Sequence, residues 1–159
     1  MSRDEPPREL DNVDAWRTPT ASQAAGLTLA AARRMIAAAE DMARQLRVAM
    51  SIAVVDAGDQ LVAFARMDGA DLVTVRLARD KAFSALMNRM PTRDLAPLVQ
   101  PGAEFYGYDS LAGGRMIVFA GGMPLERGGV LVGAVGVSGG SADEDQQAAD
   151  AAAAALEPG

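Results

Sequence analysis

The sequence predicts an α+β fold in which helices cover one antiparallel sheet of about five strands. Residues 50–56 and 60–66 are short apolar stretches on either side of Ala57-Gly58-Asp59, a spacing typical of a β-hairpin. Stretches with the period of an amphipathic helix come before this hairpin, after it and at the end of the chain. Tight hairpins pair antiparallel strands, so we do not expect a doubly wound parallel sheet.

Three long helices are predicted. Thr28 is a suitable N-cap for a helix over 28–47, in which apolar residues recur every three or four positions. A second helix is expected from about 70 to 89, where a proline follows and ends it, and a third over 143–156. After this proline, the sequence Thr-Arg-Asp at 92–94 can cap a further short helical turn, which we therefore expect there.

The remaining strands are predicted in the second half of the chain. Apolar segments at 116–120, 121–125 and 130–137 are each expected to form a strand, with a kink in the second at Pro124. Together with the first hairpin they account for the five expected strands.

The composition indicates one domain over 27–157 that follows a mobile tail over 1–26. Of the 159 residues 50% are hydrophobic but only 4% are aromatic, so small and aliphatic side chains must fill the core. The formal charge of −6 argues against a nucleic-acid surface, which needs a basic stripe. No stretch approaches the roughly 20 apolar residues of a membrane span, and the tail lacks the apolar core of a signal peptide. We therefore expect a cytoplasmic protein without nucleic-acid or membrane partners.

Histidine and cysteine are both absent from the sequence. Their absence excludes Ser-His-Asp catalysis, thiol nucleophiles, zinc fingers and histidine-ligated metals. Chemistry at any site must come from carboxylates, lysine, arginine, tyrosine and backbone groups. We expect no metal ion.

Three segments together resemble the GlcG/HbpS-like family of small haem-binding-protein relatives, which also forms the C-terminal domain of PduO-type corrinoid adenosyltransferases. They are residues 54–70, which end in Arg-Met-Asp-Gly-Ala, then Lys81-Ala82, and finally 121–125 with the glycine-rich 133–140. The resemblance covers nearly everything after the tail. It implies a profilin-like fold, a homo-oligomer, and a role with haem, corrinoid-associated or other small metabolites.

This chain departs from the family at the haem ligand. Where a member ligates haem iron through histidine, this chain has none. We therefore expect no cofactor, and haem only through a tyrosinate, methionine or oxygen ligand.

Lys81 is the first candidate site residue, because it lies on or beside the apolar face of the second helix. One interpretation is a lysine whose stem packs on the core while its ammonium reaches water. The other is a partly buried lysine that faces a ligand carboxylate or carbonyl, with its pKa lowered by desolvation.

Arg66, Met67 and Asp68 end the second strand and lead into the second helix. Asp68 is expected to N-cap that helix, and the alternative is a base or acceptor at the end of the sheet. Arg66 either pairs with Asp68 or another subunit, or clamps a substrate carboxylate. We include all three in the predicted site.

An aromatic loop is the next candidate, because half of the six Phe and Tyr residues fall within residues 104–108. Packing against the domain is the alternative for each residue taken singly. Tyr106 and Tyr108 can donate a proton or polarise a carbonyl, and Glu104 beside apolar rings can act as an acid or base. As a group they are expected to line the pocket.

The glycine-rich segments are predicted to form the opposite wall of that pocket. Gly122 and Met123 precede the last hairpin turn, and Ser138 and Gly139 lie where the final strand opens into the closing helix, whose first backbone N–H groups are expected to be free. The spacing lacks the lysine of a phosphate loop, so we expect contacts to a carbonyl or carboxylate there. Close packing and a tight turn also explain these glycines.

These features support three functional hypotheses. The leading one is a small-molecule-binding protein whose pocket lies near a subunit interface and holds a compact organic ligand. The first alternative is a cofactor-independent isomerase or lyase, in which Lys81 or Tyr106 polarises a carbonyl while Asp68 or Glu104 moves the proton. The second alternative is haem binding without a histidine ligand.

Overall fold

Four antiparallel strands form one sheet with the order β2-β1-β4-β3, which places the two hairpins side by side. The computed structural model of the protein describes residues 26–156. The predicted tail therefore lies almost wholly outside the described residues. The strands are β1 (Ser51–Asp56), β2 (Leu61–Arg66), β3 (Gly122–Arg127) and β4 (Val130–Ser138).

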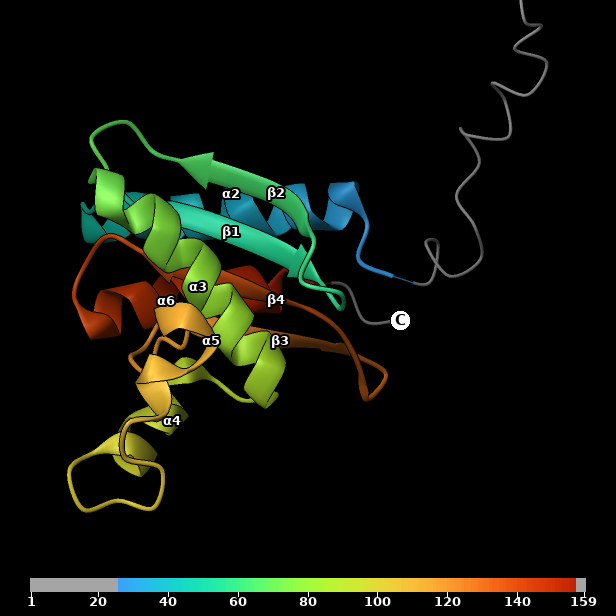
Figure 1. Ribbon diagram of the computed structural model, residues 1–159. Coiled ribbons are helices and arrows are strands. Elements are labelled where there is room, and N and C mark those ends of the chain that lie inside the picture. Colours follow the sequence, from blue (N-terminus) through green and yellow to red (C-terminus); the bar gives the residue numbers. More distant parts are fainter. Residues whose placement is uncertain (1–25, 157–159) are drawn as a thin grey trace, which may run out of the picture.

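Helices cover both faces of the sheet, which confirms the predicted α+β architecture. Helices α2 and α6 lie next to each other on one face, and α3 crosses the other face over β1, β4 and β3 (Figure 1). The segment between α3 and β3 projects from the body as a lobe of short helical turns (Figure 1). The helical elements are α2 (Leu29–Leu46), α3 (Leu72–Asn88), α4 (Thr92–Leu95), α5 (Leu111–Gly114) and α6 (Ala142–Ala154), with 3₁₀ turns η1 (Ala96–Val99) and η2 (Tyr108–Ser110).

The predicted first hairpin and first helix are confirmed. The Asp56 carboxylate accepts the backbone N–H groups of Gly58 at 2.8 Å and Gln60 at 2.9 Å, which closes the turn between β1 and β2. The Thr28 hydroxyl accepts the N–H of Ala31 at 3.1 Å and caps α2.

The expected strand at 116–120 is wrong, so the sheet has four strands where about five were predicted. These residues run as irregular backbone between α5 and β3. The cause is the buried hydroxyl of Ser84 on α3, which donates to the Asp80 carbonyl of its own helix at 2.7 Å and accepts the Ile117 N–H at 2.7 Å. The bond from Ile117 ties the segment to α3.

The expected N-cap at Asp68 is also wrong. Helix α3 begins at Leu72, and Asp71 is its N-cap, without a side-chain capping bond. Residues 68–70 instead form a turn, in which the Ala70 N–H donates to the Met67 carbonyl at 3.0 Å. Because residues 68–70 form this turn, the helix cannot begin there, and the N-cap position falls at Asp71.

Small residues set the distance between α3 and the sheet. Buried Ala78, Ala82 and Ala85 of α3 lie over β4. At Gly136 of β4 an added Cβ would lie 2.5 Å from the Ala82 nitrogen and even closer to the Ala78 carbonyl oxygen. Helix α3 therefore packs with its backbone directly on the sheet, which only glycine permits at this position.

Candidate functional site

Lys81, the only lysine in the sequence, is completely buried. Its Nζ lies 2.5 Å from Oδ2 of Asp145 on α6 and donates to the Val137 carbonyl at 3.0 Å. The Phe119 ring centroid lies 4.9 Å away. Both sequence interpretations placed the ammonium in water or against a ligand, whereas the structure places it in a protein-lined site that joins α3 to α6.

The electrostatics of this pair are those of a buried ion pair. Burial lowers the pKa of Lys81, while the charge and hydrogen bond of Asp145 act in the opposite direction. Space for the ammonium depends on Gly121, because a Cβ there would come within 3.0 Å of Nζ. The backbone of Gly121 also has a φ of +110°, which favours glycine.

The backbone N–H groups expected to be free at the start of α6 have partners within the chain. The Gly140 N–H donates to the Asp145 carboxylate at 2.8 Å, and the Ser141 N–H donates to Glu144 at 2.8 Å. Ser141 and Glu144 form a capping box. The hydrogen bonds from Ser141 lower the pKa of the Glu144 carboxyl. The expectation of free donors is therefore corrected at Gly140 and Ser141, whose N–H groups are bonded to side chains that follow the turn.

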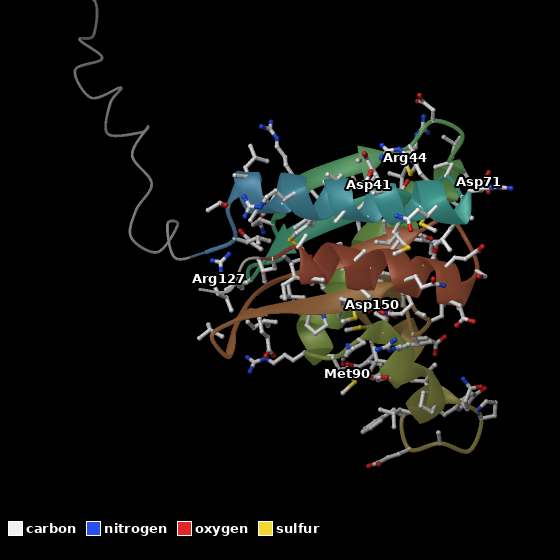
Figure 2. All side chains as sticks on the ribbon, turned by 180° about the vertical axis from the view of Figure 1, so that it is seen from behind. Asp41, Arg44, Asp71, Met90, Arg127 and Asp150 are labelled. Atoms are coloured by element: carbon white, nitrogen blue, oxygen red, sulfur yellow. The ribbon has the colours of Figure 1, made fainter. Side chains whose placement is uncertain are left out.

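The lobe beside the end of α3 contains an apolar cavity of about 220 Å³. Figure 2 shows Met90 at the side of the body from which the lobe projects. The lining residues come from the end of α3, from α4 and η1, and from the aromatic loop: Asn88, Met90, Leu95, Leu98, Val99, Phe105 and Tyr108.

Tyr108 supplies the polar group of this cavity. Its hydroxyl donates to the Asn88 side-chain oxygen at 2.6 Å, and the Asn88 amide donates to the Ser84 carbonyl at 2.8 Å. The Phe105 and Tyr108 rings lie with centroids 6.3 Å apart at an interplanar angle of 58°. The arrangement combines an apolar lining with one phenol whose position is set by α3.

The other loop residues and the end of β2 lie elsewhere. Glu104 and Tyr106 are exposed and do not line the cavity. Arg66, Met67 and Asp68 line a separate surface hollow of about 390 Å³ together with Glu40 and Arg44 of α2 (Arg44 labelled in Figure 2). The structure thus does not gather the predicted residues into one pocket.

The predicted glycine wall is part of the packed interior. Gly122 is buried, and an added Cβ would lie 2.5 Å from both the Lys81 carbonyl oxygen and Thr92. Ser138 is buried at the end of β4, and half-buried Gly139 packs on the backbone of residues 49 and 50. Met123 packs against the core between the sheet and α2 and α6.

Sequence reasoning missed Asp145, Asn88 and Met90. Asp145 had a detectable signal, because it shares a helical face with Ala148, Ala149 and Ala152, all of which are buried. An acidic residue on an apolar face needs a partner, and Lys81 is a basic residue on the apolar side of another helix. Asn88 and Met90 carry no such signal, since the cavity forms only where the lobe folds back on α3.

Comparison with known proteins identifies the family. Residues 27–154 match the family described as haem degrading protein HbpS-like. The chain belongs to this HbpS-like family. It is 42% identical over 123 residues to the corrinoid adenosyltransferase PduO of Salmonella typhimurium, covering 77% of this chain and 36% of PduO. The chain thus matches only about a third of that enzyme's length.

Two solved structures of the family resemble the fold closely. A PduOC:haem complex superposes with a TM-score of 0.81 at 37% identity, covering 84% of this chain and 97% of that one. HbpS superposes with a TM-score of 0.77 at 32% identity, covering 88% and 94%. Within residues 26–156, no helix of this HbpS-like protein is long and apolar enough to cross a bilayer.

The expectation of no cofactor, which rested on the absent histidine, is overturned by the haem complex of PduOC. Haem iron also accepts tyrosinate, thiolate and thioether ligands, so the lack of histidine does not remove a chain from a haem-binding family. The apolar cavity of this chain contains a phenol and a thioether, Tyr108 and Met90.

Proposed function

We propose that this protein binds haem, or a similarly flat and hydrophobic organic ligand, at the apolar cavity beside Tyr108. The observation that carries the proposal is the similarity to PduOC, which is 37% identical and forms a haem complex. The cavity supports it with an apolar lining and two side chains able to bind iron, Tyr108 and Met90.

The size of the cavity defines how such a ligand would sit. Its volume of about 220 Å³ is below the roughly 300–1,000 Å³ of pockets that enclose a whole ligand. It therefore suits one edge of a tetrapyrrole, with the rest lying on the surface of the lobe. A bound haem would supply redox and oxygen chemistry, whereas the chain's own residues bind and orient it.

Hemin titration tests this proposal. The wild-type protein is expected to give a saturable Soret shift, and both Tyr108→Phe and Met90→Leu are expected to raise the Kd at least about tenfold, the loss of one iron or hydrogen-bonding contact. Tyr106→Phe is the matched control, because it removes the same hydroxyl from an exposed ring outside the cavity. Circular dichroism checks that each variant is folded.

Two outcomes contradict the proposal in different ways. Absence of a saturable Soret shift in the wild type rules out haem binding. A normal shift that neither Tyr108→Phe nor Met90→Leu weakens shows that haem binds at another part of the chain.

We also propose that the protein forms a homo-oligomer. Strands β2 and β3 are the two edges of the sheet, the positions at which a second copy can add a strand. Leu61 on β2 and Val73 on α3 are large apolar side chains whose exposed fractions are 45% and 61%.

Light scattering tests the oligomer. The wild-type protein is expected to give a multiple of the chain mass, and the double variant Leu61→Asp, Val73→Asp is expected to give the mass of a single chain. A wild-type protein that is monomeric at high micromolar concentration contradicts this.

A further inference from the structure

A second hollow, with a different chemical character, lies on the outer side of α3. It has a volume of about 490 Å³ and shares no lining residue with the apolar cavity. Its residues come from α3, from the β1–β2 turn and from the segment after α5: Asp59, Leu72, Val75, Arg76, Arg79, Asp80 and Arg115. We refer to these seven residues as the arginine groove.

Asp80 orients two of the three arginines of the groove. Its side chain is only 7% exposed and accepts the Nε–H of both Arg76 and Arg115, each at 3.1 Å. Arg115 also donates through Nη1 to Asp59 at 3.1 Å. Its guanidinium carbon lies 3.7 Å from the Phe83 ring centroid. Both guanidinium groups are thus held through a few of their N–H groups, and the rest remain available to a ligand.

Arg79 completes the set with no ion pair to any residue of the part that the structure describes. The groove then holds three arginines and two aspartates, a net positive site on a chain with a formal charge of −6. A free guanidinium beside two fixed ones matches the planar, bidentate geometry of a carboxylate.

An apolar strip lies along the same side of α3. Leu72 and Val75 are spaced three apart and continue into Arg76 and Arg79, so all four share one helical face. Leu72 is 78% exposed, so its side chain is open to contact from solution. The groove therefore offers an apolar surface next to a cationic one.

We propose that the arginine groove binds a small organic acid, with the carboxylate held by Arg79 and the free edges of Arg76 and Arg115 and a short apolar chain lying on Leu72 and Val75. This site is separate from the haem cavity and does not depend on it. The two aspartates of the groove hold Arg76 and Arg115 in place. Because they also offset two of the three positive charges, the remaining charge suits one small anion.

Hexanoate is a suitable probe, followed by ¹H–¹⁵N NMR on the full chain. Wild-type protein is expected to show saturable shifts at residues 72–80 with a Kd of about 1–10 mM, a weak affinity suited to a small anion on an open surface. Arg79→Ala is expected to weaken binding at least about tenfold, and Leu72→Ser about threefold. Hexylamine, of the same length and opposite charge, is expected not to bind.

Arg89→Ala is the matched control, because Arg89 is an exposed arginine at the end of the same helix that does not line the groove. Equal effects of Arg79→Ala and Arg89→Ala, or no saturable shift in the wild type, overturn the proposal.

Hemin titration distinguishes a separate organic acid from the carboxylates of haem itself as the ligand of the arginine groove. Unchanged hemin affinity in Arg79→Ala supports a separate organic acid. A parallel loss of hemin affinity assigns the carboxylates to haem and overturns a separate acid site.

Discussion

Replacing Lys81 by methionine is expected to lower the free energy of unfolding by about 3–5 kcal/mol, because it leaves the Asp145 carboxylate buried without its cation. The Asp145 side chain is only 5% exposed and Lys81 is fully enclosed, so water cannot replace the lost partner. Asp145→Asn is expected to cost a similar amount, since it removes the negative charge that faces the buried ammonium. Urea unfolding monitored by circular dichroism gives both values.

An exposed ion pair between α4 and α6 serves as the control. Arg93 lies 3.8 Å from Asp150 of α6 (Asp150 labelled in Figure 2), and both side chains are about half exposed, at 49% and 47%. Arg93→Met is expected to change the free energy of unfolding by less than about 0.5 kcal/mol. The double variant Lys81→Met, Asp145→Asn is expected to be less destabilised than the sum of the two single changes. Additive losses would mean that the two groups do not interact.

The same pair sets a pH dependence. Burial lowers the pKa of Lys81 from its ordinary value of 10.5. Between the lowered pKa and 10.5, the unfolded chain keeps on Lys81 a proton that the folded chain has released. Since stability rises with pH wherever the unfolded state binds more protons, the wild-type free energy of unfolding is expected to rise across this interval relative to that of Lys81→Met. If the difference in the free energy of unfolding between wild type and Lys81→Met instead falls across this interval, the pKa of Lys81 is raised in the folded protein and the prediction is wrong.

Gly136→Ala is expected to lower the free energy of unfolding by about 3 kcal/mol or more, at the upper end of the cost of overpacking a core. The new methyl group meets backbone atoms of Ala78 and Ala82, and a helix backbone cannot move aside as a side chain can. Helix α3 must shift off β4, which loosens both the buried pair at Lys81 and the packing of Ala82. Thermal and urea unfolding measure the loss.

Gly58→Ala is the control for this substitution. Gly58 lies in the β1–β2 turn at an ordinary φ, and an added Cβ would come no closer than 3.3 Å to the Asp56 side chain. Its effect is expected to stay below about 1 kcal/mol. Similar losses at Gly58 and Gly136 would show that the contact between α3 and the sheet is softer than the structure indicates.

Local signals accounted for most of the elements. The hairpin over 50–66 followed from its turn residues, and the start of α2 followed from Thr28, because the interactions that form them lie within a few positions of the chain. The strand predicted at 116–120 failed for the opposite reason. The backbone N–H of Ile117 in this segment donates to Ser84, 33 positions earlier, and no local pattern records that contact.

In the candidate site, too, some features follow from the sequence and others only from contacts between distant segments. The sequence by itself determined the family, the α+β class and the residue types available for chemistry, since these depend on composition and order along the chain. Only the tertiary structure decided that Lys81 faces Asp145, that Tyr108 bonds Asn88 and that Arg115 joins Asp59 and Asp80. Each of these pairs is brought together by the packing of elements distant in sequence. Burial and partner choice are properties of that packing, so a residue's type and spacing do not reveal them.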